Sequence, residues 1–430
     1  MRRRILQEPR FTLQEAKQRS TLLSSRCIKK VKSMIENTQT LEQPLIWPDE
    51  VTHVPKQIFV RDDVYQEELK RIFYGAEWHP IAHGSEIPNI GDYRTTAVGE
   101  IPLLITRDED NKINVMYNSC SHRGVQVEVN AKGNKRRFEC PYHRWSFNIR
   151  GDLIGCPLKP GEAGGFSRKD YPLAKPRVAI IHGLIFVTFS SETPEIETFL
   201  DGYEEKLLNA MGGTDKLKLI GYHRYVIHAN WKTYHDNDGW HAPLLHVAFR
   251  MLNWQGGKGS QFANDRGHRG FESTLSIPDN QSLLSDPSLI EFKSGDPERG
   301  SCSLHLFPLF SAVRHMDSIG LRFINPLGVN KTELSFAYFG HEDDSEEMLR
   351  HRARQSSNLL GPSGLVSIED SAVFQRLHIG SFTPGDQIFQ KGAIDSQTIP
   401  SKFGQNDEAV NILSWEHYRR VMGFRKADDQ

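Results

Sequence analysis

Residues 118–147 read NSCSHRGVQVEVNAKGNKRRFECPYHRWSF and contain two short pairs of cysteine and histidine. Cys120 stands two positions before His122, and Cys140 stands three positions before His143. Strand-like runs such as IPLLITR (101–107) and KINVMYN (112–118) precede them, so each pair is expected in a tight turn between strands. Two thiolates and two imidazoles on neighbouring turns predict a metal centre.

Two kinds of centre accept these four ligands. A Cys2His2 zinc site would, but zinc pairs normally begin with two cysteines and not with C-x-H. A [2Fe–2S] centre of the Rieske type takes one Cys and one His from each of two loops, with both Cys on one iron and both His on the other. The spacing favours the Rieske centre. Trp145 is expected to pack over it, and Cys156, which has no histidine at pair spacing, is expected to be a buried structural thiol.

A redox centre needs a source of electrons, and the sequence shows none of its own. It has no G-x-G-x-x-G after a strand, which would indicate a nicotinamide or flavin fold, and no C-x4-C-x2-C run of a plant-type ferredoxin. The chain is therefore expected to depend on an external reductase, acting directly or through a ferredoxin.

Composition places the chain among ordinary globular proteins. Its 430 residues carry 53 Lys and Arg against 54 Asp and Glu, so no overall field favours a nucleic acid or a membrane surface as partner. The longest apolar run, VAIIHGLIFVTF (178–189), is too short to span a bilayer and is predicted to form a buried strand pair. Five cysteines at irregular spacing indicate working thiols in a reducing cytoplasm.

A second cluster of candidate ligands lies in YHDNDGWHAPLLH (234–246). On a straight helix His241 and His246 would diverge, but Pro243 between them forces a bend that could let both reach one metal. Two His and one carboxylate form the usual site of non-haem Fe(II) oxygenases. The carboxylate is expected from elsewhere: Asp370 is the first candidate and Glu369 the second. The alternative role for Asp370 is that of an acid favoured at a helix N-terminus.

The pattern along the chain predicts an α+β protein with an all-β domain inside a larger one. We expect a basic N-terminal extension (1–45), an N-terminal part of the catalytic domain (46–77), the [2Fe–2S] domain (78–190) and the catalytic domain (191–430). Ten Lys and Arg against two Glu in residues 1–35 favour a solvated tail or peripheral helix over a nucleic-acid arm or transit peptide. Helices are expected at 197–211, 343–360 and 406–423, and strands at 311–324 and 332–341.

Over roughly residues 50–425 the chain resembles the large (α) subunit of Rieske non-haem iron aromatic ring-hydroxylating oxygenases. The likeness lies in EIPNIGDYRTT, CSHRG, CPYHRWSFNIRGDLIG, NWKTY, DGWHAPLLH, FGHEDDSEEM and NLLGPSGLVSIED. The last two blocks resemble most the branch that acts on aromatic carboxylates, such as salicylate 5-hydroxylase and terephthalate dioxygenase. Two departures stand out. Asn237 directly precedes Asp238 where the family has two residues between them, and two polar positions beyond Asp370 differ.

The resemblance implies a Rieske domain joined to a helix-grip catalytic domain, with dioxygen as co-substrate and electrons from NAD(P)H through a separate reductase. It implies a head-to-tail homotrimer, with or without a small β subunit. Asp238 would bridge His241 and the cluster ligand His143 of a neighbouring subunit. The remaining roles are cluster ligands Cys120, His122, Cys140 and His143; Fe(II) ligands His241, His246 and Asp370; and pocket residues Asn237, Leu360 and Val366.

The expected activity is insertion of one or both atoms of dioxygen into an aromatic ring, of an aromatic carboxylate in particular. Arg314, Arg322 and Arg376 are candidate partners for that carboxylate, and the sequence does not choose among them. Two alternatives stay open at this point: a Rieske electron-transfer protein without oxygenase activity, and a zinc-stabilised interaction protein.

Overall fold

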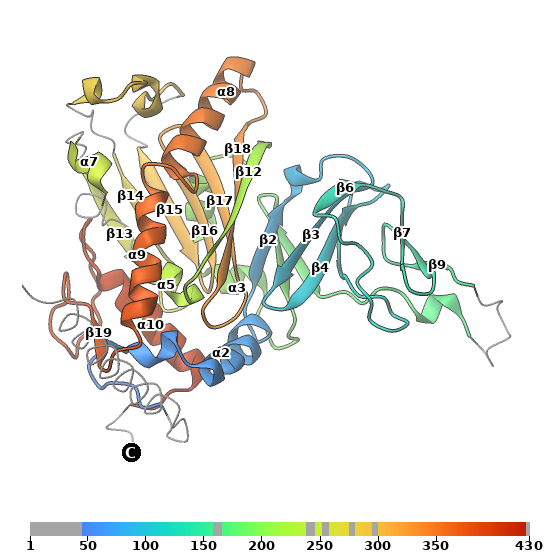
Figure 1. Cartoon of the computed structure of the whole chain (residues 1–430), viewed down its shortest axis with the longest axis horizontal. Coiled ribbons are helices and arrows are strands. Elements are labelled where there is room, and N and C mark those ends of the chain that lie inside the picture. The colour runs from blue at the N-terminus through green and yellow to red at the C-terminus, as the bar shows by residue number, and fades with distance from the viewer. Residues whose placement is uncertain are drawn as a thin grey trace, which may run out of the picture. The chain divides into compact units, whose positions relative to one another are not determined.

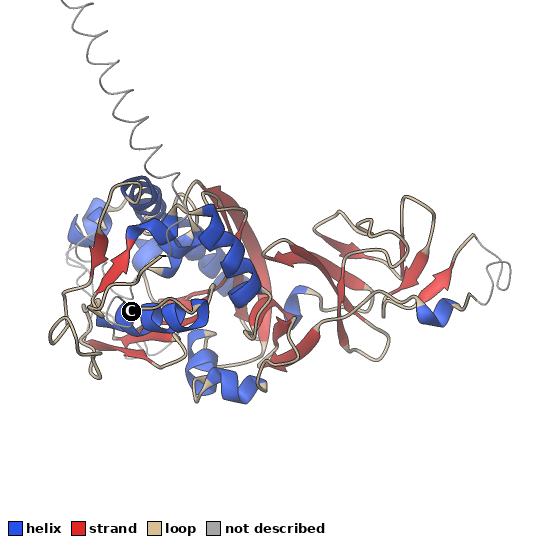
Figure 2. Cartoon of the chain, turned by 90° about the horizontal axis from the view of Figure 1, so that it is seen from below, coloured by secondary structure: helices blue, strands red, loops and turns tan. Residues whose placement is uncertain are grey.

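The computed structural model describes residues 45–157, 166–237, 246–251, 258–274, 280–294 and 300–426. From Trp47 onward the chain forms one compact unit. It contains a large antiparallel sheet covered by helices and a smaller part made mainly of strands and loops (Figures 1 and 2). This is the α+β architecture expected from the sequence. No helix in the described ranges is both long and apolar enough to cross a membrane.

The large sheet has seven strands. Their spatial order is β12 (Leu217–Ile227), β18 (Thr332–His341), β17 (Ser318–Pro326), β16 (Phe310–His315), β15 (Ser301–Leu306), β14 (Arg269–Ser273) and β13 (Gly259–Ala263). All neighbours from β18 to β13 are successive antiparallel strands, and β12 joins as an edge beside β18. The strand expected at 332–341 is confirmed as β18.

The two faces of this sheet differ in character because successive side chains of a strand point to opposite sides. Leu304, Leu321 and Phe339 belong to an apolar core shared with helices α3 (Ile196–Leu200) and α4 (Glu204–Ala210). Arg322 and Phe336, paired across β17 and β18, alternate with those residues and therefore lie on the other face. Helices α5 (Trp231–His235) and α9 (Ser367–Gly380) contact that side of the structure.

Four further α-helices lie in the described part of the chain. They are α2 (Asp62–Glu68), α7 (Val247–Met251), α8 (Glu346–Gln355) and α10 (Ala409–Met422). Helix α10 ends at Gly423, whose positive φ of 69° allows the left-handed turn that stops a helix without steric cost. Helix α10 contacts β13 and β14, the two strands at the end of the large sheet opposite β12.

The smaller part is built from three sheets. Their orders are β5 (Ile113–Tyr117), β4 (Ile101–Arg107), β3 (Asp92–Val98), β6 (Lys132–Asn134); β7 (Arg137–Glu139), β8 (Ser146–Asn148), β9 (Leu153–Gly155); and β10 (Arg177–Ile181), β11 (Leu184–Thr188), β2 (His79–His83). A core of Leu104, Met116, Phe138 and Phe147 includes both candidate ligands Cys120 and Cys140. The strand pair expected at 178–189 is confirmed as the hairpin β10–β11, but only β11 is buried; Val178 and Ile180 of β10 are exposed, which corrects the expectation of a fully buried pair.

Residues 46–77 pack with the C-terminal half of the chain. Strand β1 (His53–Pro55) pairs with β19 (Asp386–Ile388). Glu68 at the end of α2 is fully buried and accepts hydrogen bonds from Lys232, Trp231 and Tyr418, with Nζ of Lys232 at 2.6 Å. Helices α2, α5 and α10 are therefore joined at one buried carboxylate.

Three sequence expectations need correction. Residues 197–211 form two helices, α3 and α4, because Asp201 and Gly202 adopt positive φ values of 49° and 81° that no helix tolerates. Residues 311–324 form the hairpin β16–β17 and not one strand. The helix expected at 343–360 is α8 followed by a π-helical turn, Ser356–Leu360. The helix at 406–423 is confirmed as α10.

Candidate functional site

The two Cys-and-His loops close on themselves with the same backbone pattern. In the first, Cys120 N donates to Val125 O and Gly124 N donates to Cys120 O, both at 2.8 Å. In the second, Cys140 N donates to Trp145 O and Arg144 N donates to Cys140 O, at 2.8 and 3.0 Å. The equivalent residues Gly124 and Arg144 both have positive φ, 77° and 61°. Sequence spacing predicted two tight turns, and the structure shows them as a matched pair.

The loops bring two thiols and two imidazoles together. Cys120 and Cys140 are buried, and burial raises the pKa of the Cys120 thiol, with the neighbouring Cys140 acting in the same direction. The rings of His122 and His143 lie 4.7 Å apart, and Nδ1 of His143 is inaccessible and has no hydrogen-bond partner among the described residues. A buried imidazole nitrogen without a partner suits a metal ligand. The donor set therefore fits a Rieske cluster.

Aromatic residues contact both imidazoles. Trp145 stacks on His122, with ring centroids 4.7 Å apart and planes 11° apart, which confirms the packing expected from the sequence. The ring of Tyr142 lies 3.8 Å from that of His143. Cys156, expected to be buried, is only half-buried because it follows the last residue of β9 at the edge of the core.

A second group of candidate ligands forms beside α9. Nε2 of His246, just before α7, lies 3.6 Å from Oδ1 of Asp370, and both side chains are almost completely buried. Two ligands of one ion each lie roughly 2 Å from it, so this separation is compatible with a shared metal. Residues far apart in sequence thus meet here as predicted.

Glu369, the second candidate for the carboxylate ligand, holds a different position. Its Oε2 lies 3.1 Å from Nδ1 of His246, the nitrogen opposite the one that faces Asp370, and it accepts a hydrogen bond from Val247 N at 3.0 Å. A carboxylate that binds the outer nitrogen of a metal-ligating imidazole orients the ring and raises its basicity. In this position Glu369 can orient the ring of His246.

The structure describes only some of the other residues singled out in the sequence. Asp238, His241 and Pro243 lie outside the described residues. Asn237 ends the described segment after α5, and Leu360 and Val366 flank the turn before α9. His235 is a structural residue: its Nδ1 lies 3.0 Å from Pro308 O and its Nε2 lies 3.1 Å from the Ser414 hydroxyl.

Across the described part of the chain, no three His, Cys, Asp or Glu side chains converge on one metal position. A two-iron cluster takes its protein ligands as separate pairs, and the Fe(II) group lacks His241, which is outside the described residues.

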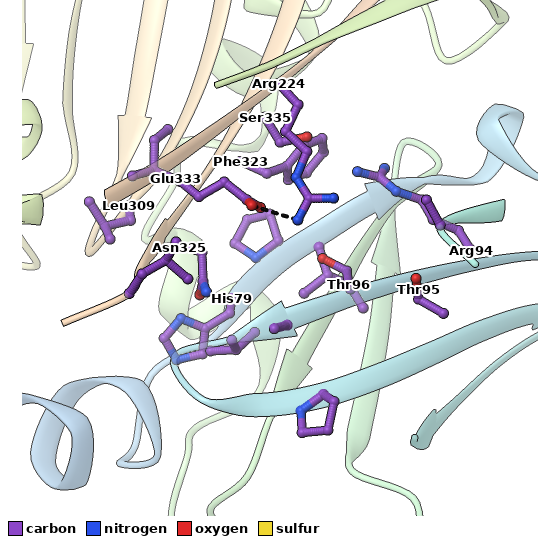
Figure 3. A pocket seen from close by; sticks show the side chains of 18 of the residues that line it. His79, Arg94, Thr95, Thr96, Arg224, Leu309, Phe323, Asn325, Glu333 and Ser335 are labelled. Carbon is purple, nitrogen blue, oxygen red and sulfur yellow. Dashed lines mark ion pairs between the residues drawn. The ribbon is translucent and has the colours of Figure 1, made fainter. Parts of the chain in front are cut away.

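A cavity of about 460 Å³ lies elsewhere, between β2 and β3 on one side and β12, β17 and β18 on the other. Figure 3 shows Thr95 and Thr96 opposite Arg224 and Glu333, which form an ion pair at 2.5 Å. None of the candidate ligands lines this cavity.

Near the candidate Fe(II) ligands, Tyr234 had no signal in the sequence, whereas Arg322, its partner, was one of three arginines considered for the substrate carboxylate. Arg322 on β17 is 7% exposed and donates through Nη1 to the Tyr234 hydroxyl at 3.1 Å. Burial raises the pKa of the Tyr234 phenol, Arg322 opposes that rise, and nearby Asp370 adds to it. Tyr234 therefore lies within electrostatic reach of both the arginine and the candidate ligand.

Comparison with known proteins agrees with this arrangement. Residues 77–172 match the model of the Rieske [2Fe-2S] domain, and residues 214–410 match the catalytic domain of the ring-hydroxylating α subunit. The alternatives of an electron carrier without a catalytic domain and of a zinc-stabilised protein are thereby removed.

Curated relatives cover most of the chain. The chain is 33% identical to a terephthalate 1,2-dioxygenase terminal oxygenase component subunit alpha from Comamonas sp, over 86% of this chain and 96% of that protein. It is 33% identical to the large oxygenase component of a salicylate 5-hydroxylase from Ralstonia sp, over 76% and 85%. The crystal structure of naphthalene 1,2-dioxygenase from Rhodococcus sp. superposes with a TM-score of 0.75 at 25% identity, covering 86% of this chain and 94% of that one.

Proposed function

Because the chain belongs to the family of Rieske ring-hydroxylating oxygenase α subunits, we propose that its own substrate is an aromatic carboxylate. The family reaction inserts one or both atoms of dioxygen into an aromatic ring. When bound, the [2Fe–2S] cluster supplies electrons received from a reductase, and the Fe(II) supplies dioxygen activation. Relatives named for terephthalate, salicylate and anthranilate support a carboxylate substrate.

We assign the cluster to Cys120, His122, Cys140 and His143, and the Fe(II) to His241, His246 and Asp370. Buried thiols, the unpartnered Nδ1 of His143 and the closeness of His246 to Asp370 support these assignments. Asp238 joins His241 to His143 of a neighbouring subunit by hydrogen bonds, which requires the head-to-tail trimer. Asn237, Leu360 and Val366 border the substrate.

The same proposal covers domain limits and location. The [2Fe–2S] domain spans 78–190, and 46–77 together with 191–430 form the catalytic domain. Burial of Glu68 against Lys232 and Tyr418 supports the inclusion of 46–77. The enzyme works in the cytoplasm, where free thiols persist.

One observation supports a carboxylate as the substrate. Arg322 is buried, and its positive charge is not paired with a carboxylate of the described residues. Its guanidinium donates to the neutral phenol of Tyr234 and stacks 4.7 Å over the ring of Phe336. No carboxylate of the described residues forms an ion pair with it. An unpaired buried charge is destabilising by several kcal/mol, so such a group usually serves a ligand of opposite charge.

The two other candidate arginines are directed elsewhere. Arg314 precedes the β16–β17 turn on the face packed against α4, and its Nε donates to Asn209 O at 3.2 Å. Arg376 is exposed on α9. Arg322 alone lies on the face that α5 and α9 cover, and its fork can donate two parallel hydrogen bonds to one carboxylate. The phenol of Tyr234, kept protonated by burial, can add a third donor.

The test replaces Arg322 by Met, which matches its length without charge. The substrates are benzoate-, salicylate- and phthalate-type acids and the corresponding neutral amides, with a surrogate reductase and product mass as readout. Arg322→Met should raise KM for the acids roughly 10- to 150-fold, the loss expected for hydrogen bonds to a charged group, and leave the amides unaffected.

Stability gives an independent readout. Removal of a buried unpaired cation should leave the melting temperature unchanged or raise it, whereas loss of a structural ion pair would lower it. Arg314→Met is the matched control, a buried arginine from the opposite face of the sheet. Equal KM values for acids in the wild type and Arg322→Met would refute the role of Arg322. A wild type that hydroxylates no aromatic acid would refute the substrate class.

A further inference from the structure

The last described residues before the candidate ligand segment, 235–237, are held by groups remote in sequence. Arg269 on β14 is 2% exposed, and its guanidinium donates to the carbonyl oxygens of His235 and Asn237, the latter at 3.3 Å. The same guanidinium donates to the Ser414 hydroxyl at 2.8 Å. One planar cation therefore ties the end of α5 to helix α10.

Helix α10 contributes three contacts of its own. Asn411 Nδ2 donates to Asp236 O at 2.8 Å, and Trp415 Nε1 donates to Oδ1 of Asp236, also at 2.8 Å. Ser414 lies 3.1 Å from Nε2 of His235. Each of residues 235, 236 and 237 is thus bound by β14, by α10 or by both.

These contacts supply hydrogen-bond partners for the C-terminal end of α5. The last carbonyl groups of a helix have no partners within it, and α5 has only five residues. A cation at this end meets the partial negative charge of the carbonyls, and its hydrogen bonds are charge-assisted. A buried arginine and the Asn411 amide satisfy these carbonyls, and the Trp415 indole binds the side chain of Asp236, so groups remote in sequence fix the position of this segment.

The sequence departure at Asn237 makes this position consequential. Asp238 follows Asn237 directly, without the two residues that the resemblance leads one to expect. No residue therefore lies between Asn237, the last residue held by Arg269, and the segment that contains Asp238 and His241. The position of Asn237 therefore sets where that segment begins.

We propose that Arg269, with Asn411 and Trp415 of α10, is a clamp that positions the iron-ligand segment. The inference rests on the proposed function, because it takes Asp238 and His241 as the site residues of that segment. The members of the clamp are positioning residues: they contact neither substrate nor metal. A misplacement of about 1 Å at a reacting centre can slow turnover roughly 100-fold, so a small loosening is measurable.

The experiment compares the full-length holoprotein with Arg269→Lys and Trp415→Phe. Lysine keeps the charge but cannot reach several acceptors in one plane, and phenylalanine keeps the ring packing but removes the donor to Asp236. Arg314→Lys is the matched control: it weakens a buried arginine of the same sheet that binds Asn209 and no residue of 235–237. The readouts are the Fe(II) dissociation constant after chelation, the rate at which the reduced cluster is oxidised in a single turnover, and the melting temperature.

For both clamp variants we expect Fe(II) binding about 10-fold weaker or cluster oxidation 10- to 100-fold slower, with the cluster spectrum unchanged. Arg314→Lys should change neither. Wild-type values in both clamp variants would overturn the proposal, as would an equal loss in Arg314→Lys, which would indicate general destabilisation. A wild type that binds no Fe(II) apart from its cluster would instead refute the proposed function and leave the contacts of the clamp as a matter of folding alone.

Discussion

Replacement of Glu369 distinguishes the role of this acid from that of Asp370, its neighbour at the start of α9. Oε2 of Glu369 lies 3.1 Å from Nδ1 of His246, and the Glu369 side chain is 27% exposed, so its charge is partly desolvated. A carboxylate in this role typically contributes 10- to 100-fold to metal affinity, about 1.4–2.7 kcal/mol. Glu369→Gln keeps an oxygen acceptor but loses the charge, so we expect the lower end, about 10-fold weaker Fe(II) binding. Glu369→Ala also removes the acceptor for Val247 N and should approach 100-fold.

The assay removes the mononuclear iron with a chelator and titrates Fe(II) back without oxygen, while the absorbance of the Rieske cluster serves as internal control. Asp370→Asn is the matched neighbour and should lose Fe(II) binding altogether. If Glu369→Gln loses iron as completely as Asp370→Asn, Glu369 is itself a ligand and the reasoning is wrong. Unchanged affinity would equally refute an orienting role.

Three further predictions concern stability and turnover. Lys232→Met leaves the buried carboxylate of Glu68 uncompensated and should lower the free energy of unfolding by about 3–5 kcal/mol in urea, with part of that restored by adding Glu68→Gln. Burial lowers the pKa of His268 from 6.5 to about 3, so below pH 6.5 only the unfolded chain binds this proton. As the pH is lowered from 6.5 towards 3, protonation of His268 in the unfolded chain should therefore reduce the free energy of unfolding by about 1.4 kcal/mol per pH unit. The urea midpoint of His268→Gln should decline less steeply over the same range. Asp238→Ala should keep both metals and lose turnover; full activity would contradict the bridging role.

The cluster loops were predictable because their information is local. Each Cys-and-His pair lies within one turn, and the turn closes by backbone bonds between residues only four or five positions apart. The strand at 332–341 and the helix at 406–423 were likewise expected from their own stretches of sequence, and they are β18 and α10. These features need no knowledge of distant segments.

The roles of Glu369 and Arg322 could not be read from the sequence because they depend on non-local packing. Glu369 and Asp370 are adjacent acids, and only the approach of His246 shows which one faces which ring nitrogen. Arg314 and Arg322 lie in one β-hairpin, and their opposite faces follow from where the turn falls. The break at Asp201 and Gly202 was likewise concealed by helix-forming residues on both sides.

The different character of the two faces of the large sheet has a consequence for the evolution of substrate specificity in this enzyme. Residues on the α3 and α4 face can drift among apolar side chains of similar volume with small effects on stability and none on selectivity. On the opposite face, where we propose that Arg322 binds the substrate carboxylate, single substitutions around Arg322 and Phe336 would alter the charge and shape of that proposed binding site. A mutant library confined to alternate positions of β16, β17 and β18 should therefore yield most of the new specificities, and one confined to the intervening positions should yield almost none.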